Sequence, residues 1–377
     1  MKILLHIGTH KTGTSSIQNF CARNQIFLAE HGFYYGLRGD LSARNVNFLG
    51  AWLANEKHNL VQGFLDNVIR KAEQANLSQV LLSGESFFAM TTHFSKSETI
   101  SESEYWILEQ KRIESLAKML NTHETEIVCY LRRQDQFAES LYNQMVKQAS
   151  GFQGDFEMFL RRISFSLDYF RHIDVWSNCF KNSLIQIRSF HQSPDVVTDF
   201  VNHALRIDIL PSGYSASSRV NINLSQDLLE FKRELNTKKM SPAEELMAYR
   251  AVLVIAKVMG GGNSRLLTHS RRKELLKHHA PGNESLIKLW HAGKSIFPEI
   301  SAQDSDERPY AGLMPAKRNE IGEMYAKLMR KPSVRIEIAL RTFFRWADKT
   351  LWIGKYLVRP IRAFTYRRHL DREIIDT

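Results

Sequence analysis

The chain begins with an apolar run, a glycine-containing loop and a helical pattern, and this order constrains the fold more than any other feature. The apolar run over residues 3–7 predicts a short buried strand. Residues 14–31 predict an amphipathic helix that Gly32 ends. A strand, a loop of small residues and a helix gather backbone N–H groups at a helix N-terminus, where the macrodipole favours an anion. The start of the chain is therefore predicted to bind an anion.

The loop resembles a phosphate-binding loop, with one departure. Gly8 and Gly13 have the spacing of the glycines in G-x-x-x-x-G-K-[ST], and Ser15 keeps the final hydroxyl. Thr14, however, occupies the lysine position, and Lys11 lies inside the loop. The loop therefore suits a phosphate but lacks the lysine that reaches the β- and γ-phosphates of a nucleoside triphosphate.

Strand and helix patterns alternate along the first half of the chain. Further strands are predicted by apolar runs at residues 33–35, 79–83, 126–131 and 183–190. This alternation predicts an α/β fold, a P-loop-like parallel sheet flanked by helices, with helical C-terminal additions from residue 224 onward. Ligands of such sheets bind outside the carboxyl ends of the strands. The loops at residues 8–15, 84–86 and 132 onward are therefore expected to share one rim.

Two motifs carry a resemblance to one enzyme family. Residues 10–16, His-Lys-Thr-Gly-Thr-Ser-Ser, resemble the 5′-phosphosulfate-binding loop, K-[ST]-G-T-[ST], of bacterial sulfotransferases that use PAPS (3′-phosphoadenosine 5′-phosphosulfate). Residues 131–142 resemble the family's 3′-phosphate motif, an arginine at a strand end with a serine eight residues later, and Arg132 and Ser140 match it. The 3′-phosphate separates PAPS from ATP, and a guanidinium binds a phosphate through paired charge-assisted hydrogen bonds.

Two weaker similarities extend the resemblance over residues 1–300. Residues 218–221 resemble the later loop that closes over the nucleotide, which makes Arg219 a further candidate for the 3′-phosphate. Residues 289–297 resemble the end of the catalytic domain in bacterial members. We therefore expect a sulfotransferase domain over residues 1–300, followed over residues 301–377 by a linker and a basic, aromatic helical extension.

The resemblance implies in-line transfer of a sulfuryl group from PAPS to an acceptor hydroxyl or amine, with adenosine 3′,5′-bisphosphate as product and no metal. Lys11 would offset the negative charge that develops on the leaving phosphate. Glu85 is the candidate general base, with His10 and His93 as alternatives, since sulfotransferases use either Glu or His. Glu85 would otherwise stabilise a helix N-terminus. The residues predicted to bind the nucleotide are His10, Lys11, Thr12, Gly13, Thr14, Ser15, Ser16, Arg132, Ser140 and Arg219.

Two further segments allow alternative interpretations. Residues 36–58 are polar and irregular, and they predict either an acceptor-binding loop or a solvated connection. Residues 334–372 interleave aromatic and basic side chains on a helical period. This pattern fits an interfacial helix that attracts anionic lipid, and it also fits a helix docked on the domain or on a second subunit. We expect residues 331–377 to contact a membrane surface or a second copy, and we expect no nucleic-acid partner.

The formal net charge of +11 over 377 residues predicts anionic partners. Three widely spaced cysteines, Cys21, Cys129 and Cys179, lack metal or disulfide spacing and predict reduced core thiols. The apolar start is too short for a signal peptide, and no uncharged apolar stretch approaches the roughly 18 residues that span a bilayer. We expect a cytoplasmic protein, with peripheral association at the inner face of the membrane as a further expectation.

The resemblance implies a PAPS-dependent sulfotransferase, and together with the net charge it favours a carbohydrate or a glycolipid as acceptor. The first alternative is a P-loop kinase of a small metabolite. It is disfavoured because the lysine after Gly13 is missing and no apolar strand ends in an aspartate suited to Mg²⁺. The second alternative is a catalytically inactive nucleotide-binding or scaffold protein on the same fold.

Overall fold

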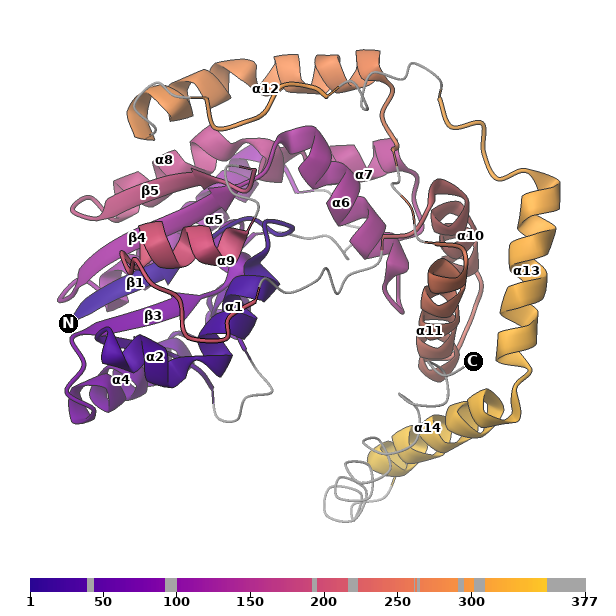
Figure 1. Cartoon of the computed structure of the whole chain (residues 1–377), viewed down its shortest axis with the longest axis horizontal. Helices are drawn as coiled ribbons and strands as arrows, with labels where there is room; N and C mark the ends of the chain where they lie inside the picture. The colour runs from indigo at the N-terminus through magenta and orange to yellow at the C-terminus, as the bar shows by residue number, and fades with distance from the viewer. Residues whose placement is uncertain are drawn as a thin grey trace. The chain divides into compact units, whose positions relative to one another are not determined.

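The computed structural model describes residues 1–38, 44–91, 100–191, 195–215, 223–260, 262, 265–290, 295–301 and 309–350, with residues 344–350 described by their backbone alone. Two compact units alternate along the chain (Figure 1). Unit 1 comprises Met1–Ala138, Glu157–Ser218 and His269–Glu307, and unit 2 comprises Glu139–Phe156, Arg219–Thr268 and Arg308–Thr377. The functional division at residue 300 that the sequence suggests stays a prediction.

Unit 1 is built on a five-stranded parallel sheet, which confirms the predicted α/β class. The strand order is β2-β3-β1-β4-β5. The strands are β1 (Lys2–His6), β2 (Phe33–Tyr35), β3 (Gln79–Ser83), β4 (Glu124–Leu131) and β5 (Leu184–Ser189). After β1 the chain continues to β2 on one side of the sheet, and after β4 it continues to β5 on the other side. The connections that follow the adjacent strands β1 and β4 therefore run in opposite directions. The carboxyl ends of β1 and β4 therefore form the topological switch point, where open α/β sheets bind ligands.

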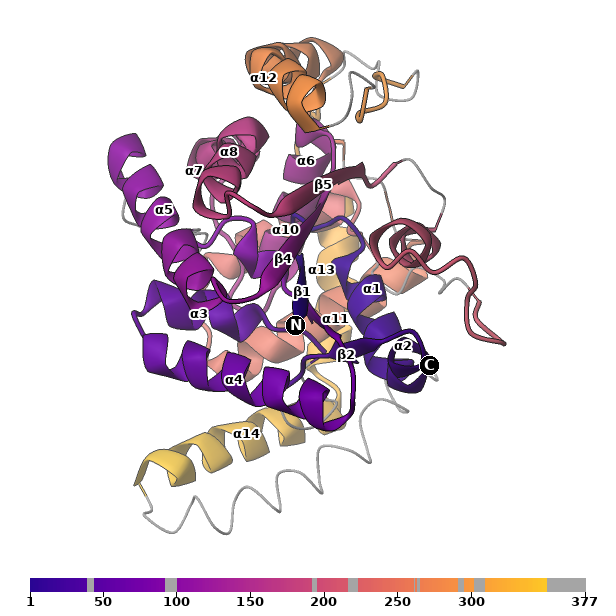
Figure 2. The ribbon, with the colours of Figure 1, turned by 90° about the vertical axis from the view of Figure 1, so that its left-hand side faces the viewer.

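Helices cover both faces of this sheet because its strands are apolar on both sides. Leu4, Val128 and Tyr130 pack with α1, α2 and α9, whereas Ile3, Leu5 and Ile127 pack with α3, α4, α5 and α8. Figure 2 shows α1 and α2 on one side of the strands and α4 and α5 on the other. The helices that lie wholly in unit 1 are α1 (Thr14–Arg23), α2 (Gln25–Glu30), α3 (Asn47–Ala54), α4 (His58–Gln74), α5 (Glu102–Met119), α8 (Tyr169–Cys179), α9 (Val196–Asp199) and α12 (His269–Trp290).

Two local predictions need correction. The single helix expected over residues 14–31 breaks at Asn24, whose side-chain amide donates to the carbonyl of Phe20 at 2.8 Å and so ends α1. Residues 36–58 are not irregular throughout, because residues 47–54 form α3. Residues 47–54 are mostly apolar, unlike their flanks, and Leu49 and Leu53, four residues apart, bury one face of that helix in the core. Residues 39–43 lie outside the described ranges.

Unit 2 is helical and contains α10 (Gln226–Asn236), α11 (Pro242–Val258), α13 (Pro315–Met329) and α14 (Pro332–Thr350). Two helices cross between the units along the chain: α6 (Gln134–Lys147) and α7 (Phe156–Arg162). A capping box begins α11: the Ser241 hydroxyl accepts from the backbone N–H of Glu244, and the Glu244 carboxylate accepts from the backbone N–H of Ser241. Within the ranges given above, no helix has the length and apolar character needed to cross a bilayer.

Candidate functional site

The loop after β1 is tied to the end of β4. The backbone N–H and the hydroxyl of Thr9 both donate to the carbonyl of Tyr130, at 3.0 and 3.3 Å. The Thr12 hydroxyl is buried and donates to the carbonyl of Thr9 at 2.6 Å, so it stabilises the conformation of the loop. Lys11 and Gly13 both have left-handed φ angles, 67° and 75°. The loop is therefore a fixed, tightly turned structure at the switch point.

The loop leads directly into α1, whose N-terminus suits an anion. Gly13 is the N-cap residue, and within the described part of the chain no side chain caps the helix there. The first turn contains Thr14, Ser15 and Ser16 and no acidic residue. Thr14 is buried, Ser16 is half-buried and Ser15 is exposed. Backbone N–H groups and the partial positive charge of the helix end can thus receive a phosphate or sulfate group.

Two glycines allow the close approach on which this loop depends. A Cβ atom on Gly8 would lie 3.1 Å from Nε2 of His6 and 3.2 Å from the backbone nitrogen of Tyr130. A Cβ atom on Gly13 would lie 2.6 Å from Cγ1 of Val196. His6 is buried beneath the loop, and its Nδ1 lies 2.8 Å from the hydroxyl of Ser83. Burial lowers the pKa of His6 to about 4, so this ring is neutral at pH 7.

Gly13→Ala is expected to lower the free energy of unfolding by about 1–3 kcal/mol, because alanine resists the left-handed φ angle and its methyl would press on Val196. Urea denaturation measures the change. Gly63→Ala is the matched control: Gly63 lies inside α4, and a Cβ there would meet no described atom within 4 Å. Alanine at that position should stabilise the protein by about 0.5–1 kcal/mol. Equal effects of the two substitutions would contradict the loop geometry.

The structure brings Arg132 of the second predicted motif to the loop of the first motif at the switch point. Arg132 follows β4 directly, and its Nη1 donates to the backbone carbonyl of Lys11 at 3.3 Å. Its guanidinium carbon lies 5.4 Å from the ring centroid of Phe190, and its own carbonyl accepts a 2.7 Å hydrogen bond from the hydroxyl of Tyr169. A cationic side chain is thereby held beside the anion-binding loop.

The neighbouring Arg133 has a structural role instead. It is buried and donates to both carboxylate oxygens of Asp135 at 2.7 and 2.8 Å, and also to the carbonyl of Pro298 at 2.9 Å. Fully buried Arg272 of α12 donates to the same carboxylate. Burial alone would raise the pKa of Asp135, but Arg133 and Arg272 hold this pKa below its ordinary value. Arg132, by contrast, donates to the loop itself.

Ser140 and Arg219 are the other residues predicted to bind the 3′-phosphate. Ser140 is half-buried in α6, eight residues after Arg132, and belongs to unit 2. Arg219 lies outside the described residues, as does His93. The roles assigned to these three residues stay predictions.

Glu85 lies in the short helix η1 (Glu85–Phe87) that follows β3, on the same rim as the loop. Its Oε2 accepts a 2.6 Å hydrogen bond from the side-chain amide of Gln18, and its Oε1 lies 4.0 Å from Nδ1 of His10. Burial alone would raise the pKa of Glu85, but His10 and hydrogen bonds from Gln18 and Asn47 hold it below its ordinary value. Burial lowers the pKa of His10 despite Glu85 nearby. At neutral pH the site therefore holds a carboxylate beside a neutral imidazole.

Sequence reasoning missed the polar residues that position Glu85. Gln18 is buried on α1, and Asn47 at the start of α3 accepts the backbone N–H of Ser86 at 3.2 Å. The Ser86 hydroxyl donates back to the carbonyl of Asn47 at 3.0 Å. The position of Gln18 could have indicated its role, because it lies on the apolar face of its helix, four residues after Thr14 and three before Cys21. A polar side chain on such a face needs a buried partner.

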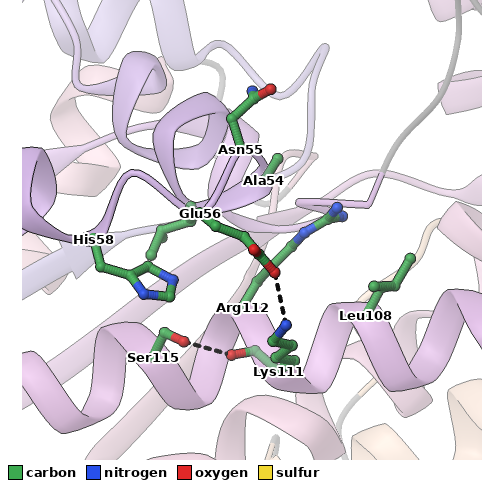
Figure 3. Close-up of a pocket in the computed structure, with 9 residues that line it drawn as sticks. Ala54, Asn55, Glu56, His58, Leu108, Lys111, Arg112 and Ser115 are labelled. Atoms are coloured by element: carbon green, nitrogen blue, oxygen red, sulfur yellow. Dashed lines mark hydrogen bonds and ion pairs between the residues drawn. The ribbon is translucent and has the colours of Figure 1, made fainter.

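A separate cavity of about 300 Å³ lies between α3, α4 and α5 and contains none of the predicted site residues (Figure 3). Lys111 and Glu56 form a 2.7 Å ion pair in its wall, and Arg112 donates to the hydroxyl of Thr91 at 2.6 Å. These contacts already engage its charged side chains. In the part of the chain that the structure describes, no group of three or more His, Cys, Asp and Glu residues is arranged to hold a metal ion.

No family model matches the chain. An uncharacterized protein of Archaeoglobus fulgidus is 28% identical over 203 residues, which are 52% of this chain and 55% of that protein. The chain thus spans about half the length of the curated relative that it matches.

One solved structure is also similar. It is a sulfotransferase from Alicyclobacillus acidocaldarius, which matches with a TM-score of 0.37 and 12% identity, over 76% of this chain and 95% of that one. That degree of likeness assigns no activity to this chain. The five-stranded parallel sheet and the contact of Arg132 with the loop are features of this chain itself.

Proposed function

We propose that the protein is a PAPS-dependent sulfotransferase. The observation that supports this proposal most is the hydrogen bond from Arg132 to the carbonyl of Lys11. It connects the loop that resembles a 5′-phosphosulfate loop to Arg132, the arginine of the motif that resembles a 3′-phosphate site. A nucleotide with phosphates on both its 5′ and 3′ positions needs two adjacent anion sites, whereas ATP needs one extended site for its triphosphate.

In the proposed reaction an acceptor hydroxyl oxygen attacks the sulfur of PAPS, and the bond from sulfur to the bridging oxygen breaks. The acceptor loses its proton to a base, and adenosine 3′,5′-bisphosphate leaves. The N-terminus of α1 would hold the 5′-phosphate, with hydroxyls of Thr14 and Ser15. The Lys11 ammonium would offset the charge that grows on the leaving phosphate. The chemistry needs positioning and charge stabilisation rather than a covalent intermediate.

Glu85 is proposed as the base because it is an anion at neutral pH on the rim beside the loop. Glu85→Gln should lower the transfer rate about 10²–10⁴-fold, since glutamine cannot accept the proton. Because the Glu85 pKa is lowered, its base form persists into acid, and the wild-type rate should stay level between about pH 8 and pH 5. Rates of labelled-sulfate transfer across this range check both statements.

The matched control is Glu73→Gln, on the exposed surface of α4, which should leave the rate unchanged. A rate that falls between about pH 6.5 and pH 5 would contradict Glu85 as base. That profile would point to His10, whose ordinary pKa of 6.5 is lowered by burial.

The acceptor is proposed to be a carbohydrate or a glycolipid, which the resemblance to bacterial members and the net charge of +11 favour. The proposal is tested by incubating the protein with PAPS labelled in its sulfate and a panel of glycans and lipids. Label on one acceptor class supports the proposal. If no acceptor is labelled and PAPS is not hydrolysed, the alternative of an inactive nucleotide-binding protein gains, and transfer of phosphate from ATP would support the kinase alternative.

A further inference from the structure

The last described helix of unit 2, α14, exposes a stripe of large apolar side chains. Ile336, Leu340 and Phe343 are 59%, 40% and 55% exposed. Their spacings of four and three residues place them on one face of the helix. Exposed apolar side chains that occur singly need no explanation, but a row of three on one helix face marks an interaction surface.

The opposite side of α14 faces its own unit. Val334 is buried, and α14 packs against α11 and α13. Glu337 and Arg341 pair with each other along the helix, and both side chains are largely shielded from solvent. The apolar stripe is therefore not the face that unit 2 uses for its own packing.

The charge of this region indicates what the stripe contacts. Residues 331–377 contain eleven lysines and arginines against five aspartates and glutamates, a formal charge of +6 out of +11 for the whole chain. The described flank of the stripe includes exposed Arg335. A symmetric dimer would bring this surface against itself, so two segments with the same charge of +6 would repel each other. A lipid membrane with anionic headgroups and an apolar interior can attract the positive charge and also bury the apolar stripe.

We propose that α14 is a membrane-surface helix, which inserts Ile336, Leu340 and Phe343 among the acyl chains of anionic phospholipid. Arg335, which is exposed on the flank of the stripe, then lies among the lipid headgroups. Binding combines the burial of apolar area with attraction to the negative surface, so it requires both the apolar stripe and the cationic side chains. The proposal goes beyond sulfuryl transfer and holds whether or not the protein has that activity.

Co-sedimentation of the full-length protein with vesicles tests the proposal, with phosphatidylcholine alone compared with phosphatidylcholine plus phosphatidylglycerol. We expect binding to the anionic vesicles that weakens with salt. Replacing Ile336, Leu340 and Phe343 by serine together should weaken it about tenfold or more. Arg335→Glu should weaken it about fivefold or more, since one cation near the surface contributes roughly that factor.

The matched control replaces Ile26, Ile107 and Ile209, which are 79%, 66% and 62% exposed in unit 1, by serine together. This variant should bind vesicles as the wild type does, and circular dichroism checks that both triple variants are folded. Equal binding to neutral and anionic vesicles, or no binding at low salt, would overturn the proposal. A mass of twice 43.7 kDa in light scattering that the α14 variant halves would also overturn it, because the stripe would then join two copies.

Discussion

Lys11→Ala is expected to lower the rate of sulfate transfer about 10²–10³-fold, the effect of removing one preorganised charge-stabilising group from a transition state. In the proposed reaction, the Lys11 ammonium would offset negative charge that develops on the leaving phosphate only as the sulfur–oxygen bond breaks. Its loss should therefore reduce the turnover number more than it reduces the affinity for PAPS. Initial rates with labelled PAPS, at several PAPS concentrations, separate the two effects.

The substitution should leave the fold intact, because the side chain of Lys11 is half-buried and its backbone carbonyl still accepts from Arg132. Lys181→Ala, at an exposed position of unit 1, is the matched control and should keep the wild-type rate. An unchanged rate in Lys11→Ala would remove the role assigned to this residue. Hydrolysis of PAPS by water gives a second rate that does not depend on finding the acceptor.

Arg132→Ala is expected to remove the preference for a 3′-phosphate. A hydrogen bond to a charged group contributes about 1.5–3 kcal/mol, so the affinity for adenosine 3′,5′-bisphosphate should fall roughly 10–100-fold. The affinity for adenosine 5′-monophosphate, which has no 3′-phosphate, should change little. Calorimetric titration of both nucleotides into both proteins gives the energy that couples Arg132 to the 3′-phosphate.

Two further variants test whether the effect comes from the guanidinium of Arg132. Arg132→Lys keeps the charge but loses the planar fork, so its preference for the 3′-phosphate should be intermediate. Arg70→Ala, on the exposed surface of α4, should behave as the wild type. If Arg132→Ala weakens both nucleotides equally, the residue supports the loop through the carbonyl of Lys11 rather than contacting the 3′-phosphate.

The sheet was predictable because its strands are short apolar runs, and the rim was predictable because parallel strands end on one side. The sequence also placed Lys11, Glu85 and Arg132 at three strand ends, and the structure finds all three on that rim. The structural role of the adjacent Arg133 could not be predicted. The partner that occupies the carboxylate beside Arg133 is Arg272, far along the chain, and no local pattern indicates such a contact.

The polar contacts of Glu85 were also not predictable from local sequence patterns. Gln18 and Asn47 come from two different helices, and their meeting with Glu85 depends on tertiary packing. The division of the first predicted helix at Asn24 depends on one side-chain hydrogen bond that competes with the helical pattern. The helix α3 was missed because it is short, contains Gly50 and has polar flanks, although Leu49 and Leu53 are buried.

The preference between two nucleotides tests the central claim most directly. Thermal unfolding is followed with adenosine 3′,5′-bisphosphate in the absence of added metal, and with ATP in the presence of Mg²⁺. A ligand at 100 times its Kd stabilises a folded protein by about 2.7 kcal/mol, which such a scan resolves. We expect adenosine 3′,5′-bisphosphate to raise the unfolding temperature at lower concentration than ATP does, and without metal. Stronger stabilisation by ATP with Mg²⁺ would contradict the assignment of a sulfotransferase.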